Sequence, residues 1–189
     1  MPYPYPAEIK NSRVMVFIDG ENLAIRYANL LGENKPFDHV QFEKDIYVWS
    51  PLLDLSSHLT VNTVRRYYYS SVRGDENRRI SIHEKLNGLG IQSPRVFPKN
   101  KTRGSKQVDI SLSVEMLSHA HYGNYDAAVL VAGDEDYIPL VEAVKAQGKQ
   151  VFIWFVKDGL SPALRRSADY YFDLGEILLN RAYSKSITS

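Results

Sequence analysis

Two apolar stretches of this sequence end directly in acidic side chains. The run from Val129 to Ala132 leads into Gly-Asp-Glu-Asp at 133–136, and the run from Val14 to Ile18 leads into Asp-Gly-Glu-Asn at 19–22. Each has the pattern of a buried strand followed by a helix, and ligands of open α/β sheets bind where such strands end. Carboxylates gathered there repel one another unless a divalent cation or protons share the site. The pattern therefore indicates a hydrolytic Mg²⁺ or Mn²⁺ site.

Each acidic group also has a purely structural explanation. Short Asp and Asn side chains commonly cap helices, and a cap accounts for any one of these residues. It accounts less well for Asp19, Asn22, Asp134 and Asp136 together. Glu135 lies between the last two, so we expect it to point away while Asp134 and Asp136 converge.

A third acidic element begins at Asp109, which we expect at the start of a helix over about 108–121. The helix dipole favours a carboxylate there whatever its function. Glu115 follows six residues later, which is about 240° around a regular helix. The two carboxylates cannot share a face unless Asp109 lies just outside the helix. Glu115 is therefore a weaker candidate ligand than Asp109.

Composition limits the class of protein. The 189 residues are 44% apolar and 24% charged, which is typical of one soluble globular domain. The absence of cysteine excludes disulfides and thiolate metal sites. We find neither an apolar run long enough to span a bilayer nor a signal peptide at the N-terminus, so we expect a cytoplasmic protein without a membrane association.

Charge is distributed unevenly along the chain. Residues 61–107 hold eleven Lys or Arg against three acids, whereas residues 108–142 hold seven acids and no Lys or Arg. A basic surface beside an acidic pocket suits a polyanion that is cut at a bound metal. The alternative is that both stretches are solvated helix faces that neutralise each other.

Specific side chains follow from the polyanion interpretation. The expected nucleic-acid contacts are Lys99, Lys101, Arg103 and Lys106, whose basic loop leads into Asp109, together with Arg66. The tyrosines at 67–69 could stack on bases. Alternate residues of a strand point into the core, however, so at least one of the three should be a packing residue.

The elements that must position these residues alternate between strand and helix. We expect strands at 13–18, 61–72, 91–97, 127–131, 150–156 and 170–172, and helices at 21–31, 38–57, 75–87, 108–121, 138–147, 161–167 and 175–183. This alternation predicts a three-layer α/β/α domain with a mostly parallel, doubly wound sheet. We assign the single domain to 13–183, with a flexible lead-in at 1–12 and a tail at 184–189.

The acidic motifs also carry a family resemblance. Phe-Ile-Asp-Gly-Glu-Asn at 17–22, Lys-Gln-Val-Asp-Ile at 106–110 and Val-Ala-Gly-Asp-Glu-Asp-Tyr-Ile-Pro-Leu at 131–140 resemble the three acidic motifs of NYN domains. NYN domains belong to the PIN-like nuclease superfamily, and the bacterial LabA-like group is the most similar branch. Gly-Lys-Gln-Val-Phe-Ile at 148–153 and Leu-Arg-Arg-Ser-Ala-Asp at 164–169 resemble the C-terminal segment of that group.

The resemblance implies a PIN-like, Rossmann-like fold and metal-dependent ribonuclease chemistry. Asp19, Asn22, Asp109, Asp134 and Asp136 would form the catalytic site, with the aspartates as ligands of Mg²⁺ or Mn²⁺ and Glu115 as a further ligand. Asn22 would orient a carboxylate or the phosphate. Two departures are Ala132, where many relatives have Ser, and Gln107, where Gly is common.

The leading hypothesis is therefore a metal-dependent endoribonuclease that acts on single-stranded or structured RNA. One alternative is a non-catalytic RNA-binding or regulatory module that keeps the acidic pocket. Another is a phosphotransfer enzyme, although no Asp-x-Asp pair follows the first strand as a phosphatase would require. A homo-oligomer and a protein partner for the N-terminal segment are both left open.

Overall fold

The computed structural model describes residues 12–53, 62–99 and 104–180. Its elements in chain order are β1 (Arg13–Asp19), α1 (Gly20–Leu31), β2 (Gln41–Glu43), β3 (Tyr47–Trp49), η2 (Pro51–Leu53), β4 (Asn62–Val72), α2 (Glu76–Gly88), β5 (Ser93–Pro98), α3 (Gly104–His121), β6 (Ala127–Val131), η4 (Glu135–Tyr137), α4 (Ile138–Ala146), β7 (Gln150–Phe155), η5 (Lys157–Gly159), α5 (Pro162–Ser167), β8 (Tyr170–Asp173) and α6 (Gly175–Leu178). The assigned lead-in at 1–12 and tail at 184–189 fall almost entirely outside these residues.

The predicted parallel sheet is confirmed. Six strands pair in the order β5-β4-β1-β6-β7-β8, and every pair is parallel. Counted along the chain, this is the 3-2-1-4-5-6 order of doubly wound folds, in which the direction of winding reverses between β1 and β6. Ile18 lies beside Val131 in the register of these two strands. The two acidic motifs therefore emerge together at the switch point, where ligands of such sheets bind.

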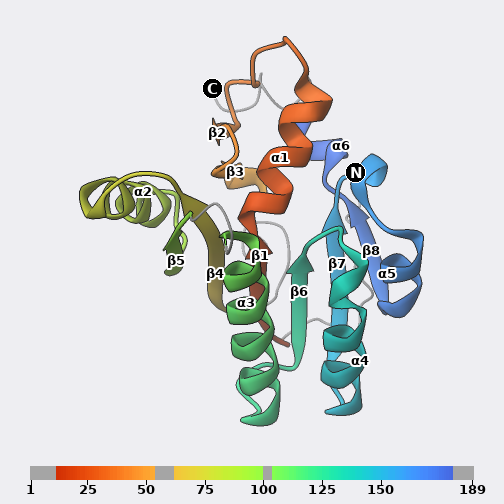
Figure 1. The fold of residues 1–189 in the computed structure, drawn as a ribbon. Coiled ribbons are helices and arrows are strands. Elements are labelled where there is room, and N and C mark those ends of the chain that lie inside the picture. Colours follow the sequence, from red (N-terminus) through yellow and green to blue (C-terminus); the bar gives the residue numbers. More distant parts are fainter. Residues whose placement is uncertain (1–11, 54–61, 100–103, 181–189) are drawn as a thin grey trace.

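Helices cover both faces of the sheet, as the three-layer prediction requires (Figure 1). Along β1, Val14, Val16 and Ile18 face one core, while Met15 and Phe17 face the other. The first core also contains buried side chains from α1, α2, α6 and β3, and the second contains buried side chains from α3, α4 and α5. No helix in the described ranges is both long and apolar enough to cross a membrane.

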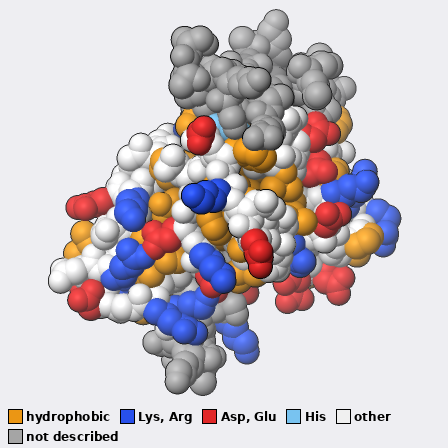
Figure 2. All heavy atoms as spheres, turned by 90° about the horizontal axis from the view of Figure 1, so that it is seen from above, with side chains coloured by type: hydrophobic (Ala, Val, Ile, Leu, Met, Phe, Trp, Pro, Cys, Tyr) orange, Lys and Arg blue, Asp and Glu red, His pale blue; other side chains and the backbone are white. Residues whose placement is uncertain are grey.

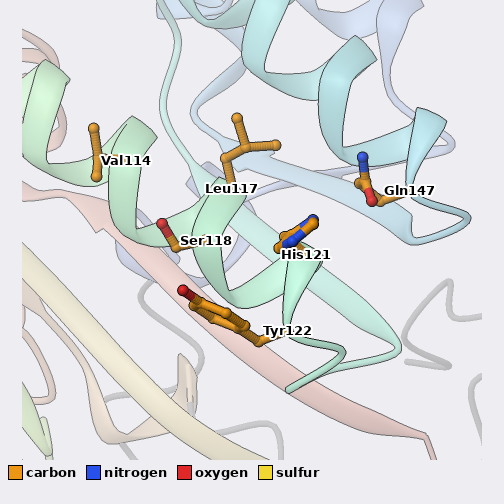
Figure 3. Close-up of a pocket in the computed structure, with 6 residues that line it drawn as sticks. All are labelled: Val114, Leu117, Ser118, His121, Tyr122 and Gln147. Atoms are coloured by element: carbon orange, nitrogen blue, oxygen red, sulfur yellow. The ribbon is translucent and has the colours of Figure 1, made fainter.

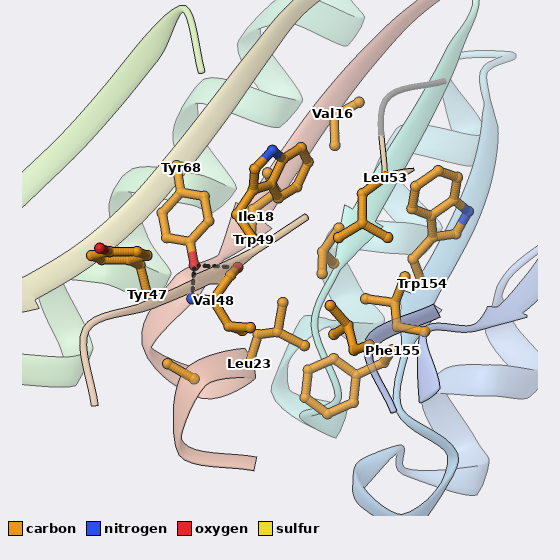
Figure 4. Close-up of a cluster of buried hydrophobic side chains, with 14 of the residues drawn as sticks. Val16, Ile18, Leu23, Tyr47, Val48, Trp49, Leu53, Tyr68, Trp154 and Phe155 are labelled. Carbon is orange, nitrogen blue, oxygen red and sulfur yellow. Dashed lines mark hydrogen bonds between the residues drawn. The ribbon is translucent and has the colours of Figure 1, made fainter. Parts of the chain in front are cut away.

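The predicted helix over 38–57 is wrong for its described part, and residues 54–57 lie outside the described residues. Residues 41–49 form an antiparallel hairpin, β2–β3, whose turn places Asp45 at a φ of 60°. Tyr47, Val48 and Trp49 are all buried, which suits aromatic and β-branched side chains in a strand. The Tyr68 hydroxyl accepts from the Val48 N–H (2.9 Å) and donates to the Val48 carbonyl (3.1 Å) (Figure 4). A contact 20 residues away thus overrides the helical periodicity.

Two further boundaries differ from the predictions. The helix α3 begins at Gly104, four residues before the expected start, so Asp109 lies inside the helix rather than at its N-terminus. The last helix, α6, ends at Leu178, whereas the prediction extended to residue 183. The first difference matters for the site because it fixes the direction of Asp109 relative to Glu115.

Gly20→Ala is expected to destabilise the protein by about 3 kcal/mol. A Cβ atom at Gly20 would lie 1.8 Å from the ring of Tyr68, and that ring is held by its two bonds to Val48. Chemical denaturation measures the free energy of unfolding. Gly88→Ala is the control, because a Cβ there has no neighbour within 4 Å and alanine suits a helix. Equal stability of Gly20→Ala and wild type would contradict this packing.

Candidate functional site

Asp19 lies at the junction of β1 and α1 and is 4% exposed. Its Oδ1 accepts from the Asn22 N–H at 3.0 Å and so caps α1, as the structural explanation required. Its Oδ2 accepts from the Tyr137 hydroxyl at 2.9 Å. Capping therefore uses only one of its two oxygens, and the other faces the segment that follows β6.

Asn22 joins the two acidic motifs. Its Oδ1 accepts from the Gly133 N–H at 3.4 Å, which ties the first turn of α1 to the residue before Asp134. Gly133 is tightly enclosed, since a Cβ there would lie 2.3 Å from the Phe155 ring and 2.5 Å from the Gly159 carbonyl. The glycine before the acidic group thus lets the chain pass between α1 and the segment after β7.

Tyr137 connects carboxylates from two different elements. The side chain is 3% exposed, and its hydroxyl lies 2.9 Å from Asp19 Oδ2 and 3.2 Å from Asp109 Oδ1. A hydroxyl has one proton, so it cannot donate fully to both carboxylates at once. The pair keeps excess negative charge that a cation or a proton would neutralise.

An acidic pocket of about 220 Å³ lies next to this bridge. Its lining includes Asp109 from α3 and both Asp134 and Asp136 from the segment after β6, together with Ile110, Ser113, Val114 and Tyr137. Glu135 points elsewhere, since its Oε2 accepts from the Ser161 hydroxyl at 3.2 Å. Asp134 and Asp136 therefore line the same pocket while Glu135 points away from it, as we expected.

The pKa values of two of these carboxyl groups are raised. Burial raises the pKa of Asp19 to about 7, and nearby Asp109 and Glu21 add to this, while the bonds from Asn22 and Tyr137 oppose it. Burial also raises the pKa of Asp109, with contributions from the charges of Asp134, Asp136 and Glu21. The ionised forms are thus destabilised by a site that concentrates negative charge in a small volume.

Glu21 belongs to the same cluster, although it was not among the predicted site residues. It is 8% exposed, its Oε2 accepts from the Ser71 hydroxyl, and its Oε1 pairs with the Lys99 ammonium group. Its charge also raises the pKa of both Asp19 and Asp109. Its position between Asp19 and Asn22 in the first motif was the available signal.

Glu115 lies apart from this cluster, and its assignment as a metal ligand is corrected. It accepts from the Tyr69 hydroxyl (2.6 Å) and pairs with Arg95 (2.7 Å) on another side of α3 from Asp109. The 240° separation applies because both residues lie within the helix. A carboxylate already held by a guanidinium group and a phenol has little capacity left for a cation.

Three of the five expected nucleic-acid contacts lie among the described residues, and one of these three is plainly exposed. Lys106 is exposed in the first turns of α3, three residues before Asp109. Lys99 pairs with Glu21, and Arg66 is 7% exposed and bonded to the Gly90 carbonyl, so neither is free to bind phosphate as predicted. Lys101 and Arg103 lie outside the described residues. The exposed Arg73, which directly follows β4, is a further cation at this edge of the sheet.

The basic stretch is also less positive than its composition indicates. Ion pairs with carboxylates involve Arg78, Arg79, Lys85, Arg95 and Lys99. Seen from above, the molecule shows Asp and Glu side chains as well as Lys and Arg on one face (Figure 2). Of these pairs only Arg95 with Glu115 joins the basic stretch to residues 108–142, so mutual neutralisation of the two stretches, the alternative considered for the sequence, is seen at this one pair among the described residues.

The tyrosines at 67–69 are not available for base stacking. All three are at most 2% exposed. Tyr67 stacks on Phe17 and is bonded to His119, while Tyr68 holds the β2–β3 hairpin. They are packing residues of the two cores, which confirms the expectation that at least one of them packs and leaves none exposed for stacking on bases.

The donor set fits a hard divalent cation. Among the described residues, no three Asp, Glu or His side chains are already placed as a complete metal site. Mg²⁺, however, is usually held by one or two carboxylates and completes its shell with water. Asp19 and Asp109 share one hydroxyl and supply such a pair, while Asp134 and Asp136 offer further oxygens in the adjoining pocket.

Comparison with known proteins agrees with the geometry. The family model described as NYN domain matches residues 13–178. The low amplitude and bright protein LabA of Synechococcus elongatus is 23% identical over 177 residues, covering 88% of this chain and 86% of that protein. An uncharacterised protein of Methanocaldococcus jannaschii is 32% identical over 69 residues, which is 36% of this chain and only 29% of the archaeal protein.

A solved structure has the same fold. The crystal structure of a Vibrio parahaemolyticus protein of unknown function superposes with a TM-score of 0.67 at 19% identity. The match covers 90% of this chain and 96% of the other. At this identity the likeness establishes the α/β architecture alone.

Proposed function

This chain belongs to the NYN domain family of the PIN-like nuclease superfamily, and we propose that it is a metal-dependent endoribonuclease. One observation supports this most strongly. Asp19 and Asp109, from elements 90 residues apart in sequence, share the hydroxyl of Tyr137 beside a pocket lined by Asp134 and Asp136. Such a convergence of carboxylates at a switch point suits phosphodiester hydrolysis with Mg²⁺ or Mn²⁺.

We assign each side chain of the site a role in holding the cation or in supporting the residues that hold it. Asp19 and Asp109 hold the cation, and Asp134 and Asp136 supply additional oxygens from the exposed side of the pocket. A bound divalent cation supplies Lewis-acid polarisation of the phosphate and a more acidic water. Asn22 keeps the segment that carries Asp134 against α1 through Gly133. Glu21, neutralised by Lys99, stays with the supporting residues.

Lys106 is the cation best placed to bind the substrate backbone. Residues three apart on a helix lie on neighbouring positions of its surface, so Lys106 borders Asp109. Arg73 offers a second positive charge at the end of β4. Lys101 and Arg103 stay predictions from the sequence.

The proposal is tested with purified protein, Mn²⁺ or Mg²⁺, and matched single-stranded RNA, hairpin RNA and DNA. We expect cleavage within RNA that stops in EDTA and resumes when Mn²⁺ is restored. Cleavage that persists in EDTA would contradict metal dependence, and cleavage of DNA alone would contradict the substrate class. If RNA is bound but never cut, the alternative of a non-catalytic RNA-binding module replaces the proposal.

Tyr137→Phe is expected to weaken Mn²⁺ binding about 10-fold, because the partners that orient metal ligands commonly contribute 10- to 100-fold in affinity. Removing the hydroxyl leaves Asp19 and Asp109 without their shared donor. Isothermal titration with Mn²⁺ measures the change. Tyr125→Phe removes a buried hydroxyl that donates only to the Met116 carbonyl, so this control should retain wild-type affinity. Equal affinities for Tyr137→Phe and wild type would exclude an orienting role.

A further inference from the structure

Arg26 lies one helical turn beyond Asn22 on α1. The two residues are four apart in sequence, so their side chains lie on the same face of the helix. On that face, Asn22 accepts from the N–H of Gly133, the residue before Asp134. The face of α1 that carries Arg26 is therefore the face directed at the segment after β6.

The stem of Arg26 lies against the backbone of Gly159, which follows β7. A Cβ atom at Gly159 would lie 2.5 Å from Arg26 Nε and 2.6 Å from Arg26 Cγ, so a larger residue there would displace the arginine side chain. The carbonyl oxygen of Gly159 would in turn lie 2.5 Å from a Cβ atom at Gly133. Two close backbone approaches thus connect the Arg26 side chain to the residue before Asp134.

The guanidinium group of Arg26 is exposed and has its N–H donors to spare. Ion pairs with carboxylates hold four other arginines, namely Arg13, Arg78, Arg79 and Arg95. No hydrogen bond or ion pair joins Arg26 to the part of the chain that the structure describes. An arginine whose stem is packed and whose donors are unused suits an external anion, because guanidinium binds phosphate through two parallel N–H groups.

Arg26 brings positive charge to one side of the acidic site. The neighbouring segment η5 contributes Lys157 and Asp158, which are both exposed and offset each other in charge. On the other side, α3 contributes Lys106, close to Asp109. Because α1 packs on one core of the sheet and α3 on the other, the two cations lie on helices that cover opposite faces.

The surface further along α3 offers no comparable contact. A hollow of about 350 Å³ there is lined by Val114, Leu117, Ser118, His121, Tyr122 and, from the end of α4, Gln147 (Figure 3). None of these side chains is a Lys or Arg, whereas nucleic acids bind mainly through Lys and Arg contacts to phosphate. A polynucleotide bound at the acidic site is therefore expected to continue over α1 rather than along α3.

We propose that Arg26 binds a backbone phosphate of the RNA outside the reacting phosphodiester. This inference rests on the proposed function, because it takes RNA as the ligand of the acidic site. Lys106 and Arg26 then contact one strand on either side of the site, and the strand crosses the sheet edge at the switch point between β1 and β6. Gly159 supports the contact, because an arginine already held against the backbone loses less rotamer entropy on binding.

Binding of a fluorescent single-stranded RNA to the full chain in EDTA tests the contact without cleavage. Arg26→Ala is expected to weaken binding about 10-fold, as for the loss of one hydrogen-bonded charged contact. The plot of log affinity against log salt concentration should flatten by about 0.7, the value for one phosphate of a single strand. Arg26→Lys keeps the charge and should keep the wild-type slope. Lys149→Ala is the control, because it removes one positive charge between α4 and β7, at the opposite edge of the sheet, and should bind as wild type.

Gly159→Ala separates the placement of the arginine from its charge. The added methyl group displaces the Arg26 stem, so this variant should weaken binding about 3-fold alone and not at all in the Arg26→Ala background. Unchanged affinity and slope in Arg26→Ala, with RNA cleavage intact, would overturn this inference and leave the proposed function standing. If the wild type binds RNA through Arg26 but never cuts it, the contact is supported and the ribonuclease is not. A wild type that neither binds nor cuts RNA would overturn both.

Discussion

Asp109→Asn and Asp134→Asn are each expected to lower the rate of RNA cleavage about 1,000-fold, which corresponds to a loss of about 4 kcal/mol of transition-state stabilisation. Each substitution keeps the shape of the side chain and removes one negative charge from the pocket. Asp109 is bonded to Tyr137 and lines the pocket with Asp134, so both variants act on the site where the cation is proposed to bind. Single-turnover cleavage in Mn²⁺ measures the rate.

The chain offers a matched control for each substitution. Glu115 lies on the same helix as Asp109 but pairs with Arg95, and Glu135 neighbours Asp134 but accepts from Ser161. Glu115→Gln and Glu135→Gln are expected to change the rate by less than about 10-fold, since neither charge faces the pocket. RNA binding in EDTA should be similar in all four variants. Cleavage that depends on Glu115 as strongly as on Asp109 would contradict the site described above.

Asp19→Asn is expected to stabilise the metal-free protein at pH 8, by up to about 4 kcal/mol given 1.4 kcal/mol per pKa unit. Burial raises the pKa of Asp19 to about 7 from an ordinary value of 3.8. Wild type is therefore fully stabilised below about pH 4 and loses stability as pH rises through 7, because only the unfolded chain ionises freely in that window. Asparagine does not titrate, so the Asp19→Asn variant does not lose stability over this pH range.

Urea denaturation in EDTA at pH 5, 6, 7 and 8 isolates the effect, since EDTA removes any cation that would favour the ionised form. The stability difference between Asp19→Asn and wild type should widen from pH 5 to pH 8. Asp126→Asn is the control of opposite sign, because the bonds from Arg13 lower the pKa of Asp126 and its removal should slightly destabilise the protein at pH 8. If the stability difference between Asp19→Asn and wild type did not change with pH, the ionised Asp19 side chain would not be unfavourable in its buried position.

The parallel sheet could be predicted because its central strands β1, β6 and β7 are nearly continuous apolar runs. The predicted bounds of β6, 127–131, are those of the structure, and the doubly wound order follows from the alternation with helices. The β2–β3 hairpin could not be predicted in this way. Its strands have three residues each, and they are fixed by Tyr68 and by the left-handed turn at Asp45 rather than by periodicity. In this segment, tertiary contacts stabilise the hairpin rather than the helix that the local sequence pattern predicts.

The site was predictable at the level of its acidic motifs. Asp109, Asp134 and Asp136 line one pocket, and the helical spacing already separated Glu115 from Asp109. The supporting contacts were not predictable, because Tyr137 reaches Asp19 across 118 residues and Lys99 reaches Glu21 across 78. The burial of Arg66 was missed for the same reason, since a Lys or Arg in a charge-rich stretch is ordinarily exposed.

We propose that Asp19, Asp109 and the carboxylates after β6 hold a divalent cation. Anomalous diffraction from crystals of the wild-type protein soaked in MnCl₂ tests it most directly. A manganese peak is expected within coordination distance of Asp19 and Asp109, bordered by Asp134 or Asp136, and it should be absent from Asp109→Asn crystals. Crystals that show no peak there, or a peak that persists in Asp109→Asn, would contradict a cation site at these carboxylates.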